Sequence, residues 1–441
     1  MPEAPPSIDQ PRPAAPARRQ AWRALGSPAY RHYFFGQSLS LVGTWIQQVA
    51  LGWLAYRLTD STVLLGAVAF LSNAPQLMVA PFAGIIIDRS DRKRLMLQIQ
   101  SLMLAQAVFL AVFTHFGWIT PWLILVAAGM LGVLNSFDAP LRHSLAGQLV
   151  ARREDIPNAI ALNTLTFNIA RFIGPPAAGL LLAATSAAVC FAVNAVSFLA
   201  LILALRTLAP AAPRPTPMPF GTAMREGFGY VRGSVPVRML LSQVALLNFF
   251  AASYLPMMPA FARDVFAGGP NTLGVLLGSA GAGALVASAY LMSRPSVRGL
   301  TGSIRHACVL AGVSLTGFAL TDHLWLALLQ LFLLGFSMIV CNASTNTILQ
   351  TILPEGLRGR VLALYTAANL GAAAAGGLLV GWVADVLAPD VALLGAGLLL
   401  IAAGVRFHLR LEFMRVHLRP LYAAQGIAPR TAERSPPETR P

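Results

Sequence analysis

The stretch GIIIDRSDRKR, residues 84–94, passes within a few positions from an apolar run to a cluster of Arg and Lys. Apolar runs flank the cluster on both sides, at 63–87 and 95–116. A bilayer core of roughly 30 Å is crossed by about 20 apolar residues of helix, and Lys and Arg remain in cytoplasmic loops. The stretch therefore predicts a short cytoplasmic loop between two transmembrane helices.

Apolar runs of similar length continue through the chain. Of its 441 residues, 56% are hydrophobic and only 11% are charged, which is more apolar surface than one soluble core can bury, so the lipid bilayer is the expected partner. Twelve runs can be drawn, at 35–57, 63–87, 95–116, 119–140, 158–184, 187–206, 237–262, 271–293, 303–321, 324–346, 359–385 and 391–410. The sequence predicts an all-α membrane protein with twelve transmembrane helices.

The basic residues predict the orientation of these helices. With the N-terminus in the cytoplasm, every Lys and Arg except Arg57, Arg171 and Arg263 falls in a cytoplasmic segment or at its edge. The loops on the opposite side carry mainly Asp. Both termini are therefore expected in the cytoplasm.

The longest connection lies in the middle of the chain and predicts two halves. It occupies residues 207–236 and begins with a Pro-rich segment. Six spans precede it in an N-terminal bundle, 30–206, and six follow it in a C-terminal bundle, 237–411. Two six-helix repeats are typical of secondary transporters, whose substrate site lies near the midplane where the repeats meet. The remaining segments, 1–29 and 412–441, are expected to be cytoplasmic tails, disordered over 1–29 and from about residue 425 onward.

The loop at 84–94 resembles the cytoplasmic signature of the major facilitator superfamily, GxxxD(R/K)xG(R/K)(R/K)(R/K), with Asp91 at the usual glycine position. Gly84 would allow a neighbouring helix to approach, and Asp88 could pair with Arg or cap a helix. These features predict a latch that holds one conformation. The alternative is a basic cluster that only sets topology. The latch residues are Gly84, Asp88, Arg89, Arg92, Lys93 and Arg94.

The fifth span contains NIARFIGPPAAG, residues 168–179, which resembles the fifth-helix antiporter motif of exporters in this superfamily. The motif residues are Arg171, Gly174, Pro175 and Gly179. Proline bends a helix and glycine permits close packing, which suits a half that rocks. The alternative is a packing kink with no bearing on the direction of transport.

Arg171 is the charge that the layout does not explain. An arginine near the centre of a span costs about 2.5–3.5 kcal/mol unless it faces water or a partner. It would bind an anionic or oxygen-rich substrate, or form an ion pair with Asp138 at the end of the fourth span. Asp138 could instead belong to a helix terminus with a local ion pair.

Polar and aromatic residues within the spans describe a neutral cavity for a fairly large amphipathic solute. For each of them, hydrogen bonding between helices is the alternative. The candidates are Trp45, Gln47, Gln48, Asn135, Asn168, Arg171, Asn248, Tyr254, Asn342, Asn346, Tyr365 and Asn369. No carboxylate is evident deep in a span, so the coupling ion stays open.

The sequence argues against an enzyme. It contains no GxxxxGK[ST], GxSxG or HExxH, and its three cysteines have no metal-ligand spacing, so neither a cofactor nor a metal is expected. The net charge of +15 is scattered between apolar runs, which excludes a nucleic-acid surface.

Across residues 28–415 the order of features is similar to the exporter branch of the superfamily that contains the enterobactin exporter and the transmembrane secretion effectors. The resemblance implies the major facilitator fold in a bacterial cytoplasmic (inner) membrane. It also implies a monomeric, proton-coupled exporter of a small amphipathic molecule, such as a siderophore, drug or metabolite, by alternating access. An importer or lipid flippase of the same fold, and a non-transporting sensor or scaffold, are the alternatives. The matching segments are 35–38, 43–45, 84–94, 138–142, 158–163, 171–175 and 358–360.

Overall fold

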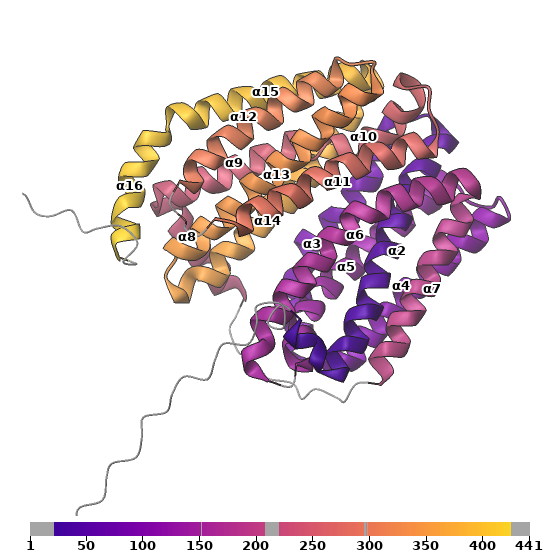
Figure 1. Cartoon of the computed structure of the whole chain (residues 1–441), viewed down its shortest axis with the longest axis horizontal. Coiled ribbons are helices and arrows are strands. Elements are labelled where there is room, and N and C mark those ends of the chain that lie inside the picture. The colour runs from indigo at the N-terminus through magenta and orange to yellow at the C-terminus, as the bar shows by residue number, and fades with distance from the viewer. Residues whose placement is uncertain (1–21, 151, 208–219, 295–296, 298, 425–441) are drawn as a thin grey trace, which may run out of the picture.

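The structure is a computed structural model, which describes residues 22–150, 152–207, 220–294, 297 and 299–424. Within these residues it is helical throughout (Figure 1). The N-terminal half contains η1 (Arg23–Gly26), α2 (Pro28–Thr59), α3 (Thr62–Arg89), α4 (Arg92–His115), α5 (Pro121–Leu149), η2 (Arg153–Asp155), α6 (Ile156–Ala184) and α7 (Ala187–Arg206). The C-terminal half contains α8 (Phe220–Gly233), α9 (Val235–Ala251), α10 (Tyr254–Ala260), η3 (Phe261–Val265), α11 (Pro270–Met292), α12 (Leu300–Ala319), α13 (Leu324–Ile352), α14 (Glu355–Val386), α15 (Pro389–Leu409) and α16 (Leu411–Ala424).

The prediction of an all-α membrane protein is confirmed. Ten helical segments of the described chain are long and apolar enough to cross a membrane, with α9, α10 and η3 together forming one of them. Two more long helices, α2 and α12, pack in the same bundles and carry more polar side chains, such as Gln47 and Gln48 in α2 and Arg305 in α12. Together these segments correspond to the twelve predicted runs.

The fourth and seventh spans differ from the prediction in ways that bear on the site. The fourth span was expected to end at residue 140, but α5 continues through Pro140 to Leu149, which places Asp138 inside the helix. Proline removes only one backbone donor, and a packed bundle tolerates the loss. The seventh span is broken after Ala251 and contains a π-helix at Phe261–Val265, next to Pro259.

The predicted tails and central connection contain ordered parts. Residues 22–29 were expected to be disordered, which is wrong: Ala24 is 1% exposed, its backbone N–H donates to Asn158 Oδ1 at 3.0 Å, and Arg23 pairs with Asp155 at 2.9 Å. Short helices α8 and α16 occupy the end of the central connection and the start of the C-terminal tail. The predicted disorder of residues 1–21 and 425–441 lies outside the described residues.

The two halves form separate bundles that meet along α3–α14 and α6–α11 (Figure 1). Glycines make both contacts close. A methyl group at Gly179 would lie 2.9 Å from Cα of Gly274, and one at Gly381 would lie 3.1 Å from Cα of Gly66. All four glycines lie toward the end of the bundles that carries Asp60, here called the Asp60 end. The glycine contacts between the halves run from the Asp60 end to about the middle of these helices in the described residues.

Candidate functional site: a central cavity between the two halves

A cavity of about 510 Å³ lies between the two halves, and ligand pockets for small organic molecules are roughly 300–1,000 Å³. It is lined by α2, α3, α5 and α6 from the N-terminal half and by α10, α11 and α14 from the C-terminal half. Apolar and aromatic side chains form much of its wall. The polar lining residues are Thr44, Gln48, Ser72, Asn73, Gln76, Asn135, Arg142, Arg171 and Tyr254.

The fifth-helix motif positions the aromatic wall of the cavity. A methyl group at Gly174 would lie 2.4 Å from Cβ of Trp45, so the absence of a side chain there allows Trp45 of α2 to pack against α6. Trp45 then meets Phe167 edge-to-face, with ring centroids 6.3 Å apart. Pro175 also lines the cavity, whereas Gly179 makes the contact with α11. The motif thus shapes both the cavity and the seam between the halves.

Arg171 lines the cavity, and its guanidinium interacts with the hydroxyl of Tyr254 on α10. The two residues come from opposite halves. The predicted ion pair between Arg171 and Asp138 is not among the contacts of these two described residues. Asp138 instead accepts a hydrogen bond from Gln100 Nε2 at 2.7 Å and forms an ion pair with Arg142 one turn along α5. Arg142 lies four residues after Asp138 on the same helix face, so the local ion pair forms in place of the predicted one.

Five of the twelve predicted cavity residues line the cavity: Trp45, Gln48, Asn135, Arg171 and Tyr254. The other seven do not. Most of those seven bond between or along helices, as the alternative interpretation held. The structure also adds Asn73 and Gln76 of α3, which were not among the predicted cavity residues.

The amides outside the cavity form two networks. Gln47 is fully buried, donates to Gln106 Oε1 at 2.9 Å and accepts from Asn194 Nδ2 at 2.8 Å, which joins α2, α4 and α7. In the other half, Asn342 Oδ1 accepts from the side chains of Asn248 at 3.0 Å and Asn369 at 3.2 Å.

Three predicted cavity residues remain. Tyr365 donates its hydroxyl to the Asn342 carbonyl at 2.9 Å, and Asn346 accepts from Gln350 at 2.7 Å on the same helix. Asn168 is half-buried on α6, outside the cavity lining.

Of the predicted loop 84–94, the structure places residues 84–89 in α3 and 92–94 in α4, so only Ser90 and Asp91 connect the two helices. Asp91, at the position where the superfamily signature has glycine, caps α4 by accepting from the backbone N–H groups of Lys93 at 2.9 Å and Arg94 at 3.2 Å. Lys93 Nζ donates to the Arg206 carbonyl at 3.3 Å, which ties α4 to the end of α7. The side chain of Asp88 lies outside the described residues, so the latch predicted there stays a prediction.

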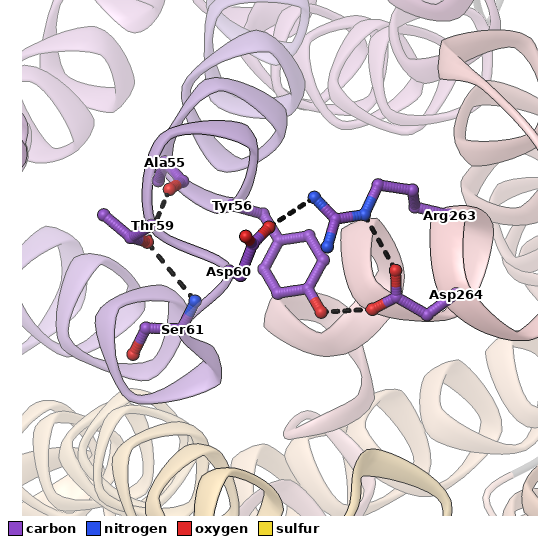
Figure 2. Close-up of polar contacts among 7 residues, drawn as sticks. All are labelled: Ala55, Tyr56, Thr59, Asp60, Ser61, Arg263 and Asp264. Carbon is purple, nitrogen blue, oxygen red and sulfur yellow. Dashed lines mark hydrogen bonds and ion pairs between the residues drawn. The ribbon is translucent and has the colours of Figure 1, made fainter.

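Sequence reasoning missed a polar cluster at the opposite end, which Figure 2 shows. Arg263 Nη1 of η3 lies 2.5 Å from Asp60 Oδ1 at the end of α2, and its Cζ lies 4.4 Å from the centre of the Tyr56 ring. Asp264 accepts from the Tyr56 hydroxyl and from Arg263 Nε. These four residues, here called the Asp60 latch, join the two halves. The available signal was Arg263, a basic residue on the side where the loops carry Asp.

A second contact between the halves lies beside the latch. Asp385, near the end of α14, accepts from Ser61 Oγ and from the Thr62 backbone N–H, both at 3.2 Å. Thr62 begins α3, so a carboxylate of one half caps a helix of the other.

Comparisons with known proteins show the family. A family model described as transmembrane secretion effector matches residues 19–428. The chain belongs to the transmembrane secretion effector family. This transmembrane secretion effector has the fold of major facilitator transporters, works in a lipid bilayer on a small-molecule substrate, and is not an enzyme.

Curated relatives cover most of the chain. A staphyloferrin A transporter from Staphylococcus aureus is 25% identical, over 80% of this chain and 89% of its own length. An enterobactin exporter from Shigella flexneri is 26% identical, over 88% of this chain and 93% of its own length.

Solved structures show the fold. A bacterial homologue of the human lysosomal transporter Spinster, in an inward-facing and unoccupied conformation, has a TM-score of 0.66 at 14% identity and covers 91% of this chain and 99% of its own. A bacterial homologue of the iron transporter ferroportin, in an inward-facing state, has a TM-score of 0.65 at 17% identity, over 86% and 98%.

Proposed function

We propose that this transporter exports a small amphipathic molecule rich in oxygen donors, such as a siderophore, by alternating access driven by a proton gradient. The observation that carries the proposal is the lining of the central cavity, which combines amides, hydroxyls and aromatic rings with Arg171. No Asp or Glu is among the described residues that line it. The names of two relatives, a staphyloferrin A transporter and an enterobactin exporter, support the same substrate class.

The charge of the cavity favours an anionic or neutral solute. Arg142 reaches the cavity but is paired with Asp138. Arg171 meets the neutral hydroxyl of Tyr254 and forms no ion pair among the described residues, so its charge is available to a solute. Hydrogen bonds from a guanidinium to carboxylate or phenolate oxygens are charge-assisted and therefore strong. Aromatic walls such as Trp45 and Phe167 suit the apolar part of such a molecule.

The orientation expected from the basic residues supports loading from the cytoplasm. If both termini are cytoplasmic, the Asp60 end faces outward, and the closed contacts there belong to an inward-facing state. In that state an exporter takes up its solute.

Asp138 is our candidate for the proton-carrying group. Its side chain is 6% exposed, and it lies within the membrane-crossing part of α5, next to Arg142 at the cavity wall. A change in the charge of Asp138 is therefore felt at the solute site. The sequence placed this residue at the end of a span, where a carrier was not expected.

Transport into everted membrane vesicles tests the substrate and the direction. Iron-free enterobactin and staphyloferrin A are the probes, each with an imposed pH gradient and with the gradient collapsed by an ionophore. We expect gradient-dependent accumulation of one of them. Folded protein that accumulates neither would contradict the proposal, and accumulation confined to right-side-out vesicles would make the protein an importer.

Arg171→Gln tests the role of the cavity charge. A charge-assisted hydrogen bond contributes about 1.5–3 kcal/mol, so the apparent affinity should fall about 10- to 100-fold. Arg57→Gln removes the same charge from the Asp60 end, outside the cavity lining, and should leave affinity unchanged. Unchanged transport by a folded Arg171→Gln variant would exclude solute contact.

Asp138→Asn tests the coupling. We expect loss of gradient-driven accumulation with retention of exchange between labelled and unlabelled solute. Asp155→Asn is the matched control, since Asp155 is a buried carboxylate that pairs with Arg23 outside the spans. Because loss of one partner of a buried ion pair destabilises a protein, the double variant Asp138→Asn/Arg142→Gln provides a second test. Gradient-driven accumulation in both variants would exclude Asp138 as the carrier.

A further inference from the structure

A second cavity, of about 410 Å³, lies at the end of the bundles opposite the Asp60 end. It is formed where α9 begins, where α15 ends and where α16 starts. Its walls combine three arginines with apolar side chains. The lining residues are Val235, Arg238, Met239, Ser242, Arg406, Phe407, Arg410 and Phe413. This cavity is separate from the central cavity and shares no residue with it.

No carboxylate of the described residues pairs with the arginines of this cavity. None of Arg238, Arg406 and Arg410 has a carboxylate within ion-pair distance in the described part of the chain; Arg238 Nη1 donates to the Arg232 backbone carbonyl at 3.0 Å. The acidic residue next in sequence, Glu412, pairs with Arg415 at 2.6 Å. Three like charges that converge on one cavity repel one another, so a bound anion would stabilise the site.

The surroundings of the cavity are those of a membrane surface. Helix α16 (yellow in Figure 1) follows directly on α15 at the edge of the C-terminal bundle. It is amphipathic: Leu411, Met414 and Leu418 are buried against the bundle, whereas Phe413 and Val416 are 56% and 60% exposed. Exposed apolar side chains beside a basic cavity, at the end of a membrane-crossing helix, offer contacts to acyl chains as well as to a headgroup.

We propose that the cavity between α9, α15 and α16 binds the phosphate group of an anionic phospholipid, with its acyl chains along the exposed face of α16. A soluble anion would use the arginines but would leave Phe413 and the apolar lining without a role. Basic pockets of this kind between helix ends are typical lipid headgroup sites. The bound lipid joins the ends of α9 and α15 and holds α16 against the membrane.

Native mass spectrometry of the full chain in a neutral detergent tests the proposal. The wild-type protein is titrated with phosphatidylglycerol and, separately, with phosphatidylcholine of the same chain length. It should retain phosphatidylglycerol far better than phosphatidylcholine. Glycerol 3-phosphate at millimolar concentration should not displace it. Equal retention of the two lipids would overturn the proposal, and so would full displacement by the soluble phosphate, since the ligand would then be a free anion.

A triple substitution locates the site. The variant R238Q/R406Q/R410Q should bind phosphatidylglycerol about 100-fold more weakly. Each arginine near an anionic lipid contributes about fivefold to the affinity, and the three contributions multiply. The matched control R31Q/R57Q/R152Q removes three exposed arginines that neither line the cavity nor lie on α16, and it should bind as the wild type does.

If the glutamine variant does not fold, two other measurements still test the site. The first is lipid binding by R238K/R406K/R410K, which preserves the three charges. The second is the lipid preference of the wild-type protein, which needs no variant. Equal loss of binding in the glutamine variant and its matched control would place the lipid elsewhere. So would a lysine variant that folds but no longer prefers phosphatidylglycerol.

Discussion

Replacement of Arg263 by glutamine should shift the transporter toward the state that is open at the Asp60 end. Arg263 makes two contacts across the interface between the halves: an ion pair with Asp60 at 2.5 Å and a cation–π contact with Tyr56 at 4.4 Å (Figure 2). Its other partner, Asp264, belongs to the same half. Only the first two contacts therefore distinguish the closed arrangement from the open one.

The size of the shift follows from how exposed these contacts are. The Arg263 and Asp60 side chains are 34% and 70% exposed, so we assign their ion pair about 0.2–1 kcal/mol. The cation–π contact contributes about 0.5–1 kcal/mol at an exposed site. Loss of roughly 1–2 kcal/mol changes the equilibrium between closed and open states about 5- to 30-fold.

Double electron–electron resonance measures this equilibrium. Nitroxides on Trp118→Cys and Leu320→Cys lie in exposed loops at the Asp60 end, one in each half, and the three native cysteines are buried. Arg57→Gln is the matched control, because it removes an arginine at the same end that has no ion pair in the described structure. Longer distances should gain population in the Arg263 variant alone. Identical distance distributions in both variants and the wild type would refute the role of the latch.

Three further predictions follow from close contacts. Gly179→Val places a side chain 2.7 Å from a carbonyl oxygen of α11, so the same nitroxide pair should report an open Asp60 end. A distance distribution unchanged from that of the wild type would contradict this. Gly335→Ala sets a methyl group 2.0 Å from the Ala280 carbonyl oxygen within the C-terminal half and should cost about 1–3 kcal/mol, seen as a lower melting midpoint in detergent. Gln47→Leu leaves Gln106 Oε1 without its donor and should cost about 1–3 kcal/mol; an unaltered melting midpoint would show that the network is dispensable.

The helices were predictable because their ends are marked chemically. The expected span 187–206 coincides with α7, which begins after a Ser and ends at an Arg. The fourth span failed because Asp138, Pro140 and Arg142 have the composition of a loop. Inside the bundle, the carboxylate of Asp138 and the guanidinium of Arg142 pair one turn apart on the same helix. The helix therefore continues through charged residues that the sequence analysis assigned to its end.

The site was only partly predictable, because composition does not show which face of a helix a residue occupies. Gln47 and Gln48 are neighbours of the same type, yet Gln48 lines the cavity and Gln47 bonds to Gln106. One residue turns the side chain by about 100° around the helix. Without knowledge of the packing, both were equal candidates.

The Asp60 latch could not be read from spacing, because its partners come from different halves of the chain. Tyr56 and Asp60 lie at the end of α2 in the N-terminal half, and Arg263 and Asp264 lie about two hundred residues later in the C-terminal half. Arg263 was an exception to the expected asymmetry of basic residues between the two sides of the membrane. The exception indicated that Arg263 has a partner, but it did not indicate which residue the partner is.

The two kinds of contact between the halves suit a transporter that must open and close. The seam at Gly179–Gly274 and Gly66–Gly381 brings backbones together at glycines. A buried hydrogen bond from Thr62 Oγ1 to the Gly381 carbonyl, at 2.9 Å, crosses it, and separation of the halves at this seam therefore breaks hydrogen bonds rather than buried ion pairs. The polar contacts at Asp60 and at Asp385 lie at the rim of the interface, where water replaces them at small cost. The contact between Arg171 and Tyr254 borders the central cavity instead. A solute that binds one state more tightly by a few kcal/mol can then reverse the equilibrium. Strong, buried ion pairs at the same seam would hold one state against any such solute. The weakness of the latch is therefore what the proposed alternating access requires.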